Sequence, residues 1–445
     1  MRSLVGVREK VAARLRSRYT LPIACAVVVQ LTVLVCILRF SADPYGGDLC
    51  RDAVTTHRLL AGQNPYQPIT ACGVLWHTPH PPAWLLLIAP FMLLPISWGI
   101  LAWDLVALMA LGIAVVIVAS ELRVRLSLPV AALAFAFITF WPPLLSTLLD
   151  GQVSPVLLLL CVLAWRWARH GKTAHAGLAL GLAAALRLFP ALLVVYFALR
   201  RDWRAVLAAG AAFALPTLAL LPVIGVSGYV DFLTREAPAS TTDWIAHPHN
   251  TSLSGLAYHV LGSFSPLDGH ASQPRTLGVV LGVALVGALL VVSYMRRHLS
   301  LPQDEPTWLA YIPVALLVTP LMWSHYYVLL LLPLAVLAAR LGWLGAPVTT
   351  PMARSPLLTQ LAAAGVVLIW LSYGLSFVWT PPATPGLLSG LVAALVEALP
   401  TCALLAVLAA LLVVDAPRRA SPRRTPWFAM VRKVLVLSPL RNFFA

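Results

Sequence analysis

The sequence contains few charged residues for its length. Asp, Glu, Lys and Arg together make up 11% of the 445 residues, hydrophobic residues make up 60%, and the mean hydropathy is +0.86. So few polar side chains cannot cover the surface of a soluble globule of this size. The composition therefore excludes a soluble protein and predicts a polytopic membrane protein.

Other patterns are missing as well. The apolar runs lack the period-two alternation of outer-membrane strands. No glycine-rich nucleotide loop of the GxGxxG kind is present, and no Cys, His and Glu spacing typical of a zinc site accompanies the histidines. The net charge of +15 comes from short Lys and Arg clusters without the interleaved aromatics of a nucleic-acid surface. We expect an all-α membrane protein with no cofactor and no nucleic-acid partner, although the pattern leaves a divalent metal open.

Cysteine is also scarce. Four of the six cysteines lie in apolar runs, where a thiol acts as a small hydrophobic group. Cys50 and Cys72 share one polar loop. The sequence leaves open whether these two form a disulfide or remain free thiols.

The apolar runs have lengths near those needed to cross a hydrocarbon core about 30 Å thick. Placing the Arg and Lys clusters on the cytoplasmic side predicts that both termini are cytoplasmic. A short pair of helices is expected to bend near Arg187 and Pro190, because proline breaks the backbone hydrogen-bond ladder. The map predicts twelve spans, at residues 20–40, 98–120, 128–149, 153–168, 175–186, 188–199, 203–221, 276–295, 308–321, 327–339, 357–379 and 387–414.

The same map sets the predicted boundaries. Residues 1–19 form a basic cytoplasmic N-terminus, 20–340 the membrane core, 341–414 the C-terminal helices and 415–445 a basic cytoplasmic tail. The core carries two outer loops, 41–97 and 223–275. The short apolar run 83–96 contains two prolines and is taken as a juxtamembrane or re-entrant segment. The alternative is a true span that inverts every later loop.

The first outer loop holds carboxylates and imidazoles, which are costly beside a bilayer and indicate a functional site. Asp48 follows a Gly pair and precedes a helical stretch, so it is either a functional carboxylate or an N-cap. Asp52 lies one helical turn later, as a second carboxylate or as a solvated partner of Arg51 or Arg58. Tyr66 lies in the turn after this helix and is expected to face what the loop covers.

Further polar residues fall on the same predicted side of the membrane. Arg187 stands in an apolar stretch with no carboxylate within six residues, and a guanidinium suits a phosphate; the alternative is an arginine that snorkels to the interface. The remaining candidates have alternatives as loop, helix-end or interfacial residues, and they are His77, His80, Asp150, Gln152, His249, Asn250, Trp323 and His325. Their convergence on one face predicts a single site there.

The order of several segments resembles a known family. These segments are GGDLCRDA…LLAGQNPY, PHPPAWLLLIAPF, GQVSPVLLLL, AGLALGLAAALRLFPALL, NTSLSGL and WSHYY, spread over about residues 44–340. Together they resemble the GT-C class of membrane glycosyltransferases, specifically glycosyltransferase family 87, which contains polyprenyl-phosphate-mannose-dependent mannosyltransferases and arabinofuranosyltransferases. The chain departs from the family pattern at the start of the first helix, at Arg187 in place of a usual Lys, and at His80 in place of a common aromatic.

The resemblance implies an inverting transfer of a sugar, expected to be mannose, from a polyprenyl-phosphate donor to an envelope glycolipid or polysaccharide on the extracytoplasmic face. Asp48 is expected to act as the general base and Arg187 to hold the leaving phosphate. The remaining residues expected to bind substrate are Asp52, Tyr66, His77, His80, Asp150, Gln152, His249, Asn250, Trp323 and His325. The alternatives are a polyprenyl-phosphate-arabinose donor or, from another class, a lipid-linked sugar transporter.

Overall fold

The computed structural model describes residues 47–71, 74–124, 136–138, 140–262, 271–344, 356–378 and 387–414. The predicted span 20–40, the two predicted cytoplasmic ends and Cys72 lie outside these ranges. Within them the chain is mostly helical, as the sequence predicts. The first elements are α2 (Gly47–Leu60), α3 (Pro82–Met92), α4 (Ile96–Glu121), α6 (Pro142–Asp150), α7 (Ser154–Arg169), α8 (Thr173–Leu186), α9 (Ala191–Leu199) and α10 (Trp203–Ala219).

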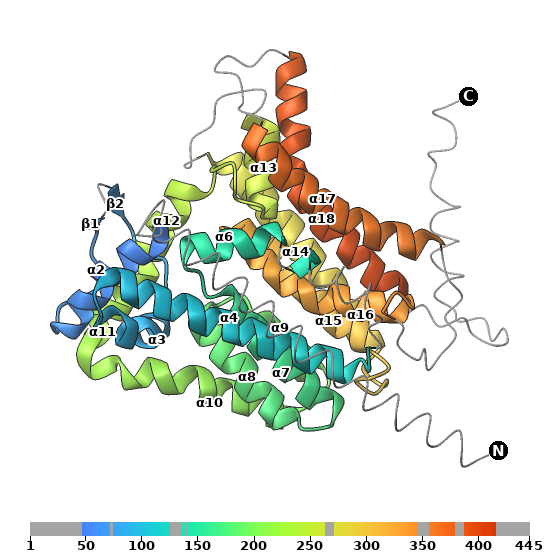
Figure 1. Cartoon of the computed structure of the whole chain (residues 1–445), viewed down its shortest axis with the longest axis horizontal. Coiled ribbons are helices and arrows are strands. Elements are labelled where there is room, and N and C mark those ends of the chain that lie inside the picture. Colours follow the sequence, from blue (N-terminus) through green and yellow to red (C-terminus); the bar gives the residue numbers. More distant parts are fainter. Residues whose placement is uncertain are drawn as a thin grey trace. The chain divides into compact units, whose positions relative to one another are not determined.

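The second half of the described chain is also helical (Figure 1). Most of the predicted outer loop 223–275 consists of helices, and α17 and α18 run side by side. The elements are α11 (Leu221–Asp231), the π-helix η1 (Phe232–Glu236), α12 (Ala237–Trp244), α13 (Leu253–Gly262), α14 (Ser272–Met295), α15 (Glu305–Val318), the 3₁₀ helix η2 (Ser324–Leu330), α16 (Leu331–Arg340), α17 (Pro356–Val378) and α18 (Leu387–Val414).

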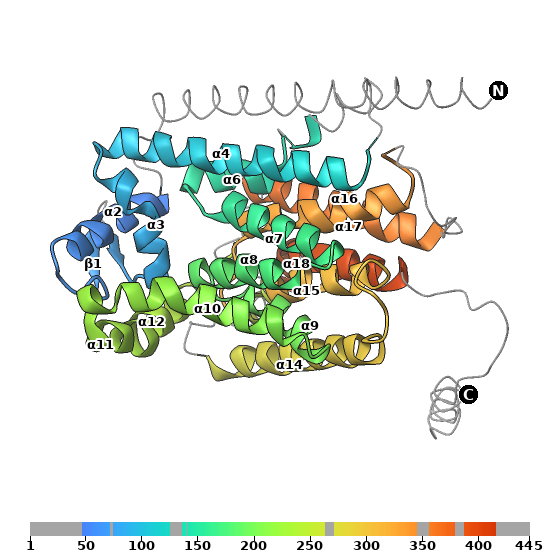
Figure 2. The ribbon, with the colours of Figure 1, turned by 90° about the horizontal axis from the view of Figure 1, so that it is seen from below.

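The all-α prediction needs one small correction. Strands β1 (Ile69–Ala71) and β2 (Val74–Trp76) form an antiparallel pair with Ile69 opposite Trp76. These two short segments are rich in residues that favour strands, and the sequence analysis treated them only as part of a polar loop. The hairpin lies beside α2 and α3, in the part of the molecule that also contains α11 and α12 (Figures 1 and 2).

The twelve predicted spans are not all single long helices. Among the described residues, α4, α14 and residues Leu391–Leu412 of α18 are long and apolar enough to cross a membrane alone. A fourth candidate is the pair formed by α10 and residues Leu221–Trp244, which bends by 102°. Apart from α17, which has 23 residues, the other predicted spans within the described residues are shorter helices, so the count of twelve stays a prediction. These long apolar helices indicate that the chain is a membrane protein.

Two predicted segments differ in detail. The predicted span 128–149 does not run unbroken through its described part, because Trp141 has an extended backbone and α6 begins after it as a separate nine-residue helix. The run 83–96 forms α3, whose 11 residues rise only about 17 Å and cannot cross a core about 30 Å thick. The bend predicted near Arg187 is present, because Arg187 has an extended backbone between α8 and α9.

Close packing between α8 and α10 depends on small residues. A methyl group added at Gly177 would lie 2.0 Å from the carbonyl oxygen of Ala205, and one added at Gly181 would lie 2.1 Å from that of Ala209. In a membrane the helices gain little from hydrophobic burial against each other, so they associate through such close backbone contact. This packing holds the end of α8, and therefore Arg187, in a fixed position.

Candidate active site

Asp48 lies in the first turn of α2 and is held by two side chains. Its Oδ1 accepts a hydrogen bond from Arg51 Nη1 at 3.1 Å, and its Oδ2 accepts one from Gln152 Nε2. Because α2 begins at Gly47, Asp48 is a first-turn residue and its described hydrogen bonds go to side chains and not to the helix backbone. The Asp48 side chain is 27% exposed and lines a cavity. It is therefore a partly exposed carboxylate on the cavity wall.

Gln152 connects Asp48 to Arg187. While its Nε2 donates to Asp48, its Oε1 accepts a hydrogen bond from Arg187 Nη2 at 3.1 Å. Gly151 makes this possible: its left-handed backbone (φ 64°) ends α6, and an added methyl group would lie 2.0 Å from Leu49. A residue larger than glycine would push the Gln152 loop away from α2. One amide therefore fixes the carboxylate and the guanidinium relative to each other.

Arg187 is buried at 8% exposure and lines the same cavity. Its guanidinium carbon lies 5.6 Å from the ring centre of Tyr326 and 5.9 Å from that of Trp84. Within the described ranges no carboxylate lies within ion-pair distance of Arg187, and its Nε has no hydrogen-bond partner. A buried guanidinium without a counter-ion is costly. An anionic ligand in the cavity would relieve this cost, and the phosphate role of Arg187 stays a prediction.

Behind Asp48 lies a buried cluster formed by Arg51, Asp52, His80 and Trp84. Arg51 Nε donates to Asp52 Oδ1 at 2.8 Å, and Trp84 Nε1 donates to Asp52 Oδ2 at 2.7 Å. Asp52 is only 1% exposed, so its prediction as a solvated residue is wrong, although its predicted pairing with Arg51 is confirmed. Asp52 does not line the cavity and instead supports Arg51 and His80 from behind.

His80 is held in one protonation state. Burial and the charge of Arg187 lower its pKa from 6.5 to about 4, so its imidazole is neutral at pH 7. Its Nδ1 lies 3.0 Å from Asp52 Oδ2 and its Nε2 lies 3.2 Å from Arg51 Nη2. A neutral ring with the proton on Nδ1 donates to the carboxylate and accepts from Arg51. Burial alone would raise the pKa of Asp52, but the charge of Arg51 and the contacts with His80 and Arg51 together outweigh burial and lower this pKa below its usual range.

The second outer loop brings aromatic rings to the cavity. His247, His249 and Trp323 line it, with 5.0 Å between the ring centres of His247 and Trp323. Burial lowers the pKa of His247 to about 4 and that of His249 below 6.5, so both rings are neutral at pH 7. His325 also lines the cavity, and its Nε2 has no hydrogen-bond partner among the described residues. These flat rings therefore form part of the cavity wall.

Asn250 lies beside this wall but does not line the cavity. Its Nδ2 donates to the carbonyls of Ile245 (2.8 Å) and Pro320 (3.0 Å), and its Oδ1 accepts from the backbone N–H of Met322 at 3.0 Å. Asn250 therefore joins the loop before α13 to the loop before η2. Its position supports a role in holding Trp323 and His249 at the cavity.

Three other predicted residues differ in their placement. His77 does not line the cavity; its Nδ1 lies 3.2 Å from Glu236 Oε1. Tyr66 is buried, as predicted, and its hydroxyl donates to the His80 carbonyl at 3.1 Å. Asp150 lines the cavity at the end of α6, and its Oδ2 accepts from Ser146 Oγ at 3.2 Å. Of the predicted residues, the cavity is lined by Asp48, His80, Asp150, Gln152, Arg187, His249, Trp323 and His325.

The cavity has a volume of about 990 Å³, at the upper end of the range for small-molecule sites. The sequence analysis missed several residues that line it, namely Arg51, Ser146, Tyr326 and Glu397. Arg51 had a signal in its spacing of three from Asp48, and Glu397 had one as the only charged residue of α18. Within the described ranges no group of three or more His, Cys, Asp or Glu is arranged to hold a metal.

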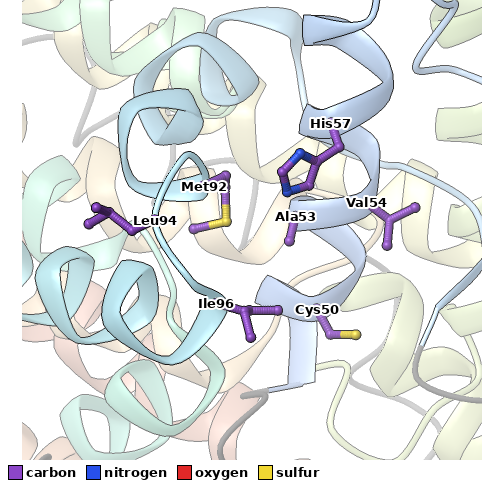
Figure 3. Close-up of a pocket in the computed structure, with 7 residues that line it drawn as sticks. All are labelled: Cys50, Ala53, Val54, His57, Met92, Leu94 and Ile96. Carbon is purple, nitrogen blue, oxygen red and sulfur yellow. The ribbon is translucent and has the colours of Figure 1, made fainter.

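A second, smaller pocket of about 200 Å³ lies on another face of α2 (Figure 3). Apart from His57, its lining is apolar or Cys50, with side chains from α2 and from the α3–α4 segment. Cys50 is disulfide-bonded. None of the groups around Asp48 or Arg187 lines this pocket, so the chemistry belongs to the large cavity.

Comparison with known proteins identifies the family. The sequence model of Glycosyltransferase family 87 matches residues 77–322, which is more than half of the chain. The chain is 33% identical over 366 residues to the polyprenol-phosphate-mannose-dependent alpha-(1-2)-phosphatidylinositol mannoside mannosyltransferase of Mycobacterium tuberculosis, covering 74% of this chain and 77% of that protein. The chain belongs to glycosyltransferase family 87. It is a membrane glycosyltransferase, so the transporter alternative is not carried further.

Two further similarities are weaker. An alpha-(1->3)-arabinofuranosyltransferase of Mycobacterium tuberculosis is 31% identical over 171 residues, covering 36% of this chain and 38% of that protein. Among solved structures, ArnT from Cupriavidus metallidurans bound to undecaprenyl phosphate aligns over 88% of this chain and 77% of that chain, with a TM-score of 0.37 and 16% identity. The GT-C architecture implied by the resemblance therefore stays an expectation.

Proposed function

We propose that this chain is an inverting mannosyltransferase that moves mannose from polyprenyl-phosphate mannose to a hydroxyl of a mannosylated glycolipid. The observation that carries the proposal is the chain of contacts from Asp48 through Gln152 to Arg187, on the wall of one large cavity. It places a carboxylate and an unpaired guanidinium side by side. These are the two groups that sugar transfer from a phosphate requires.

The residues divide the chemistry between them. Asp48 takes the proton of the acceptor hydroxyl while the oxygen of that hydroxyl attacks the anomeric carbon. The bond between the anomeric carbon and the phosphate oxygen breaks, and Arg187 stabilises the phosphate that leaves. Because phosphate leaves as an anion, no protonated carboxylic acid is needed, unlike glycoside hydrolysis. One displacement inverts the anomeric centre.

The supporting residues keep these two groups in their working states. Arg51 donates to both Asp48 and Asp52, which orients the Asp48 carboxylate. The neutral His80 adds no charge to the cluster. The indole of Trp84 faces Arg187 and donates to Asp52, so it links the two parts. The base and the phosphate-binding arginine therefore rest on one preorganised buried network.

The donor assignment has a direct test. The purified chain in lipid nanodiscs is given polyprenyl-phosphate mannose or polyprenyl-phosphate arabinose, each with a phosphatidylinositol mannoside or a total envelope lipid extract as acceptor. We expect transfer from the mannose donor, because the relative covering most of the chain is named for that donor. Transfer from the arabinose donor alone would assign the second candidate, which the similarity to the arabinofuranosyltransferase supports. Transfer from neither would contradict the proposal.

We also propose that the cavity opens on the extracytoplasmic face and that both termini are cytoplasmic. Arg169, Arg200, Arg296 and Arg340 lie around Asp304 and Glu305 at the start of α15, whereas the chain after Val318 lines the cavity. The 14 residues of α15 separate the two by about 20 Å. Arginines gather on the cytoplasmic side of membrane proteins. This arrangement supports the map predicted from the sequence.

The sidedness is tested with an impermeant maleimide on intact cells. A cysteine introduced at the exposed Gln63 should be labelled, and one at the exposed Gln303 should react only after the membrane is opened. The parent chain serves as the background. The reverse pattern would place the cavity on the cytoplasmic side.

A further inference from the structure

Besides Asp48 and Asp150, the cavity is lined by a third acidic residue, Glu397, which has no part in the contacts described around Asp48. Glu397 lines it from α18, in a stretch that lies beyond the part matched by the family model. It is the only charged residue of a 28-residue helix whose window Leu391–Leu412 is apolar enough to span a membrane. An ionisable residue inside such a helix is expensive to place and marks a functional site.

Glu397 is oriented by His259 of α13. His259 Nδ1 lies 3.0 Å from Glu397 Oε2, and its Nε2 lies 3.2 Å from the carbonyl oxygen of Asn250. Both ring nitrogens of His259 contact oxygen atoms, so the two contacts fix the orientation of the ring beside Glu397. Among the described residues no side chain other than His259 bonds the Glu397 carboxylate. The second carboxylate oxygen, Oε1, therefore remains available to a ligand in the cavity.

The surrounding part of α18 is also prepared to accept hydrogen bonds. Pro400 has no N–H, so the Val396 carbonyl four residues earlier lacks its helical donor, and both residues line the cavity. The helix is fixed here, because Thr401 Oγ1 donates to the carbonyl of Thr251 at 3.0 Å and the Tyr327 hydroxyl donates to the carbonyl of Pro400 at 2.9 Å. This wall offers a carboxylate and a carbonyl in fixed positions.

The charges of the cavity separate two kinds of ligand group. The arginines among its lining residues, Arg51 and Arg187, lie with Asp48 and suit the donor phosphate, whereas a carboxylate repels phosphate. Hydrogen-bond acceptors on the α18 wall suit the hydroxyls of a sugar. The donor sugar is bonded directly to its phosphate and so stays close to Arg187. The hydroxyls that reach Glu397 then belong to the other substrate.

We propose that Glu397, positioned by His259, binds hydroxyl groups of the acceptor sugar and sets the affinity for the acceptor. The inference rests on the proposed function and adds the location of acceptor binding. Glu397 takes no part in proton transfer from the attacking hydroxyl, which belongs to Asp48. Its removal therefore changes the acceptor KM and leaves the donor KM unchanged.

The test compares steady-state kinetics of Glu397→Gln, Glu397→Asp and His259→Gln in nanodiscs, with polyprenyl-phosphate mannose and a phosphatidylinositol mannoside varied in turn. We expect Glu397→Gln to raise the acceptor KM about 10-fold or more, as for a lost hydrogen bond to a charged group, with the donor KM within about twofold. Glu397→Asp, which keeps the charge on a shorter side chain, should lie between Glu397→Gln and wild type. His259→Gln should raise the acceptor KM in the same direction.

Glu121→Gln is the matched control, since Glu121 also pairs with a histidine, His170 at 3.0 Å, outside the cavity. It should leave both KM values unchanged. An unchanged acceptor KM in Glu397→Gln, or equal rises in both KM values, would overturn the inference, and a lower melting temperature with an unchanged acceptor KM would show a structural pair. If wild type transfers nothing to this acceptor, the proposed function fails for it. The acceptor KM measured with the total lipid extract then tests Glu397 separately.

Discussion

One group of arginines and carboxylates lies at the start of α15, and another lines the cavity beyond its end. The two groups are arranged differently. At the start of α15, Glu305 accepts a hydrogen bond from Trp165 Nε1 at 2.8 Å and forms ion pairs with Arg169 and Arg340. Beyond its last residue, the chain lines the same cavity as Arg187, for which no carboxylate partner exists among the described residues. The start of α15 is a closed ion-pair cluster, whereas the cavity is an open one.

The difference separates structure from function. In a closed cluster every buried charge has a partner, and breaking one pair leaves an uncompensated charge. In the open cluster, the contacts of Arg187 within the described part of the chain are the amide oxygen of Gln152 and two aromatic rings. Under the proposed function, the donor phosphate supplies the missing counter-charge. Mutations at the two ends should therefore act on different quantities, activity at one and stability at the other.

The largest effect is expected at Asp48. Asp48→Asn removes the base, and losing a general base typically lowers the rate by ~10²–10⁴. The melting temperature should change little, because Asn keeps the shape and the contact with Gln152. Turnover and thermal unfolding are measured on the same nanodisc preparation. If Asp52→Asn were inactive while Asp48→Asn kept its activity, the buried carboxylate would be the base instead.

In contrast to Asp48→Asn, Glu305→Gln should lower stability and leave activity nearly unchanged. It leaves Arg169 and Arg340 without their carboxylate, and breaking a buried ion pair costs roughly 3–5 kcal/mol. Unfolding in denaturant should shift accordingly, while kcat per folded molecule stays near that of wild type. Glu121→Gln removes a more exposed ion pair, with an expected cost below about 1 kcal/mol. If Glu305→Gln lowered kcat per folded molecule, the ion-pair cluster at the start of α15 would also contribute to activity, and the separation of the two clusters would be wrong.

A pH titration tests the open cluster through His80. Its pKa is about 4 in the folded state against 6.5 ordinarily, so the unfolded chain takes up a proton that the folded chain does not. The stability contribution is complete above about pH 6.5 and is lost as the pH falls toward 4, by on the order of 3 kcal/mol. In His80→Asn, the melting temperature should therefore fall less between pH 6.5 and pH 4 than it does in wild type. An equal pH dependence in wild type and His80→Asn would show that His80 titrates normally.

The smallest of these effects concerns donor binding by Arg187. Arg187→Gln should raise the donor KM by roughly 10- to 150-fold, the equivalent of about 1.5–3 kcal/mol for a charge-assisted contact. Arg187→Lys should recover part of the loss, since it keeps the charge but not the bidentate geometry. The acceptor KM is measured beside it as the internal control. Equal donor KM values in wild type and both variants would remove the phosphate role.

The sequence pointed to many of the residues that line the cavity, because charged and polar residues are costly in an apolar chain and therefore stand out. Arg187 was found from the absence of a nearby carboxylate, and Asp48 from the loop and the family resemblance. The positive-inside map brought distant segments to one face, and the cavity contains eight of the predicted residues. What failed were statements about exposure. Asp52 was expected in solvent, yet Trp84 and His80, which lie about 30 residues later, bury it.

The sequence by itself determined the class of the protein, its helical character and the set of groups able to do the chemistry, because burial costs limit where charges can stand. Only the tertiary structure decided which groups meet. Gln152 lies 104 residues from Asp48 and 35 from Arg187, and no local pattern encodes that its amide joins them. Likewise, Glu397 is a single charge in an apolar helix until His259, 138 residues away, is placed against it. Such pairs depend on how the helices pack, and that packing is set by contacts spread over the whole chain.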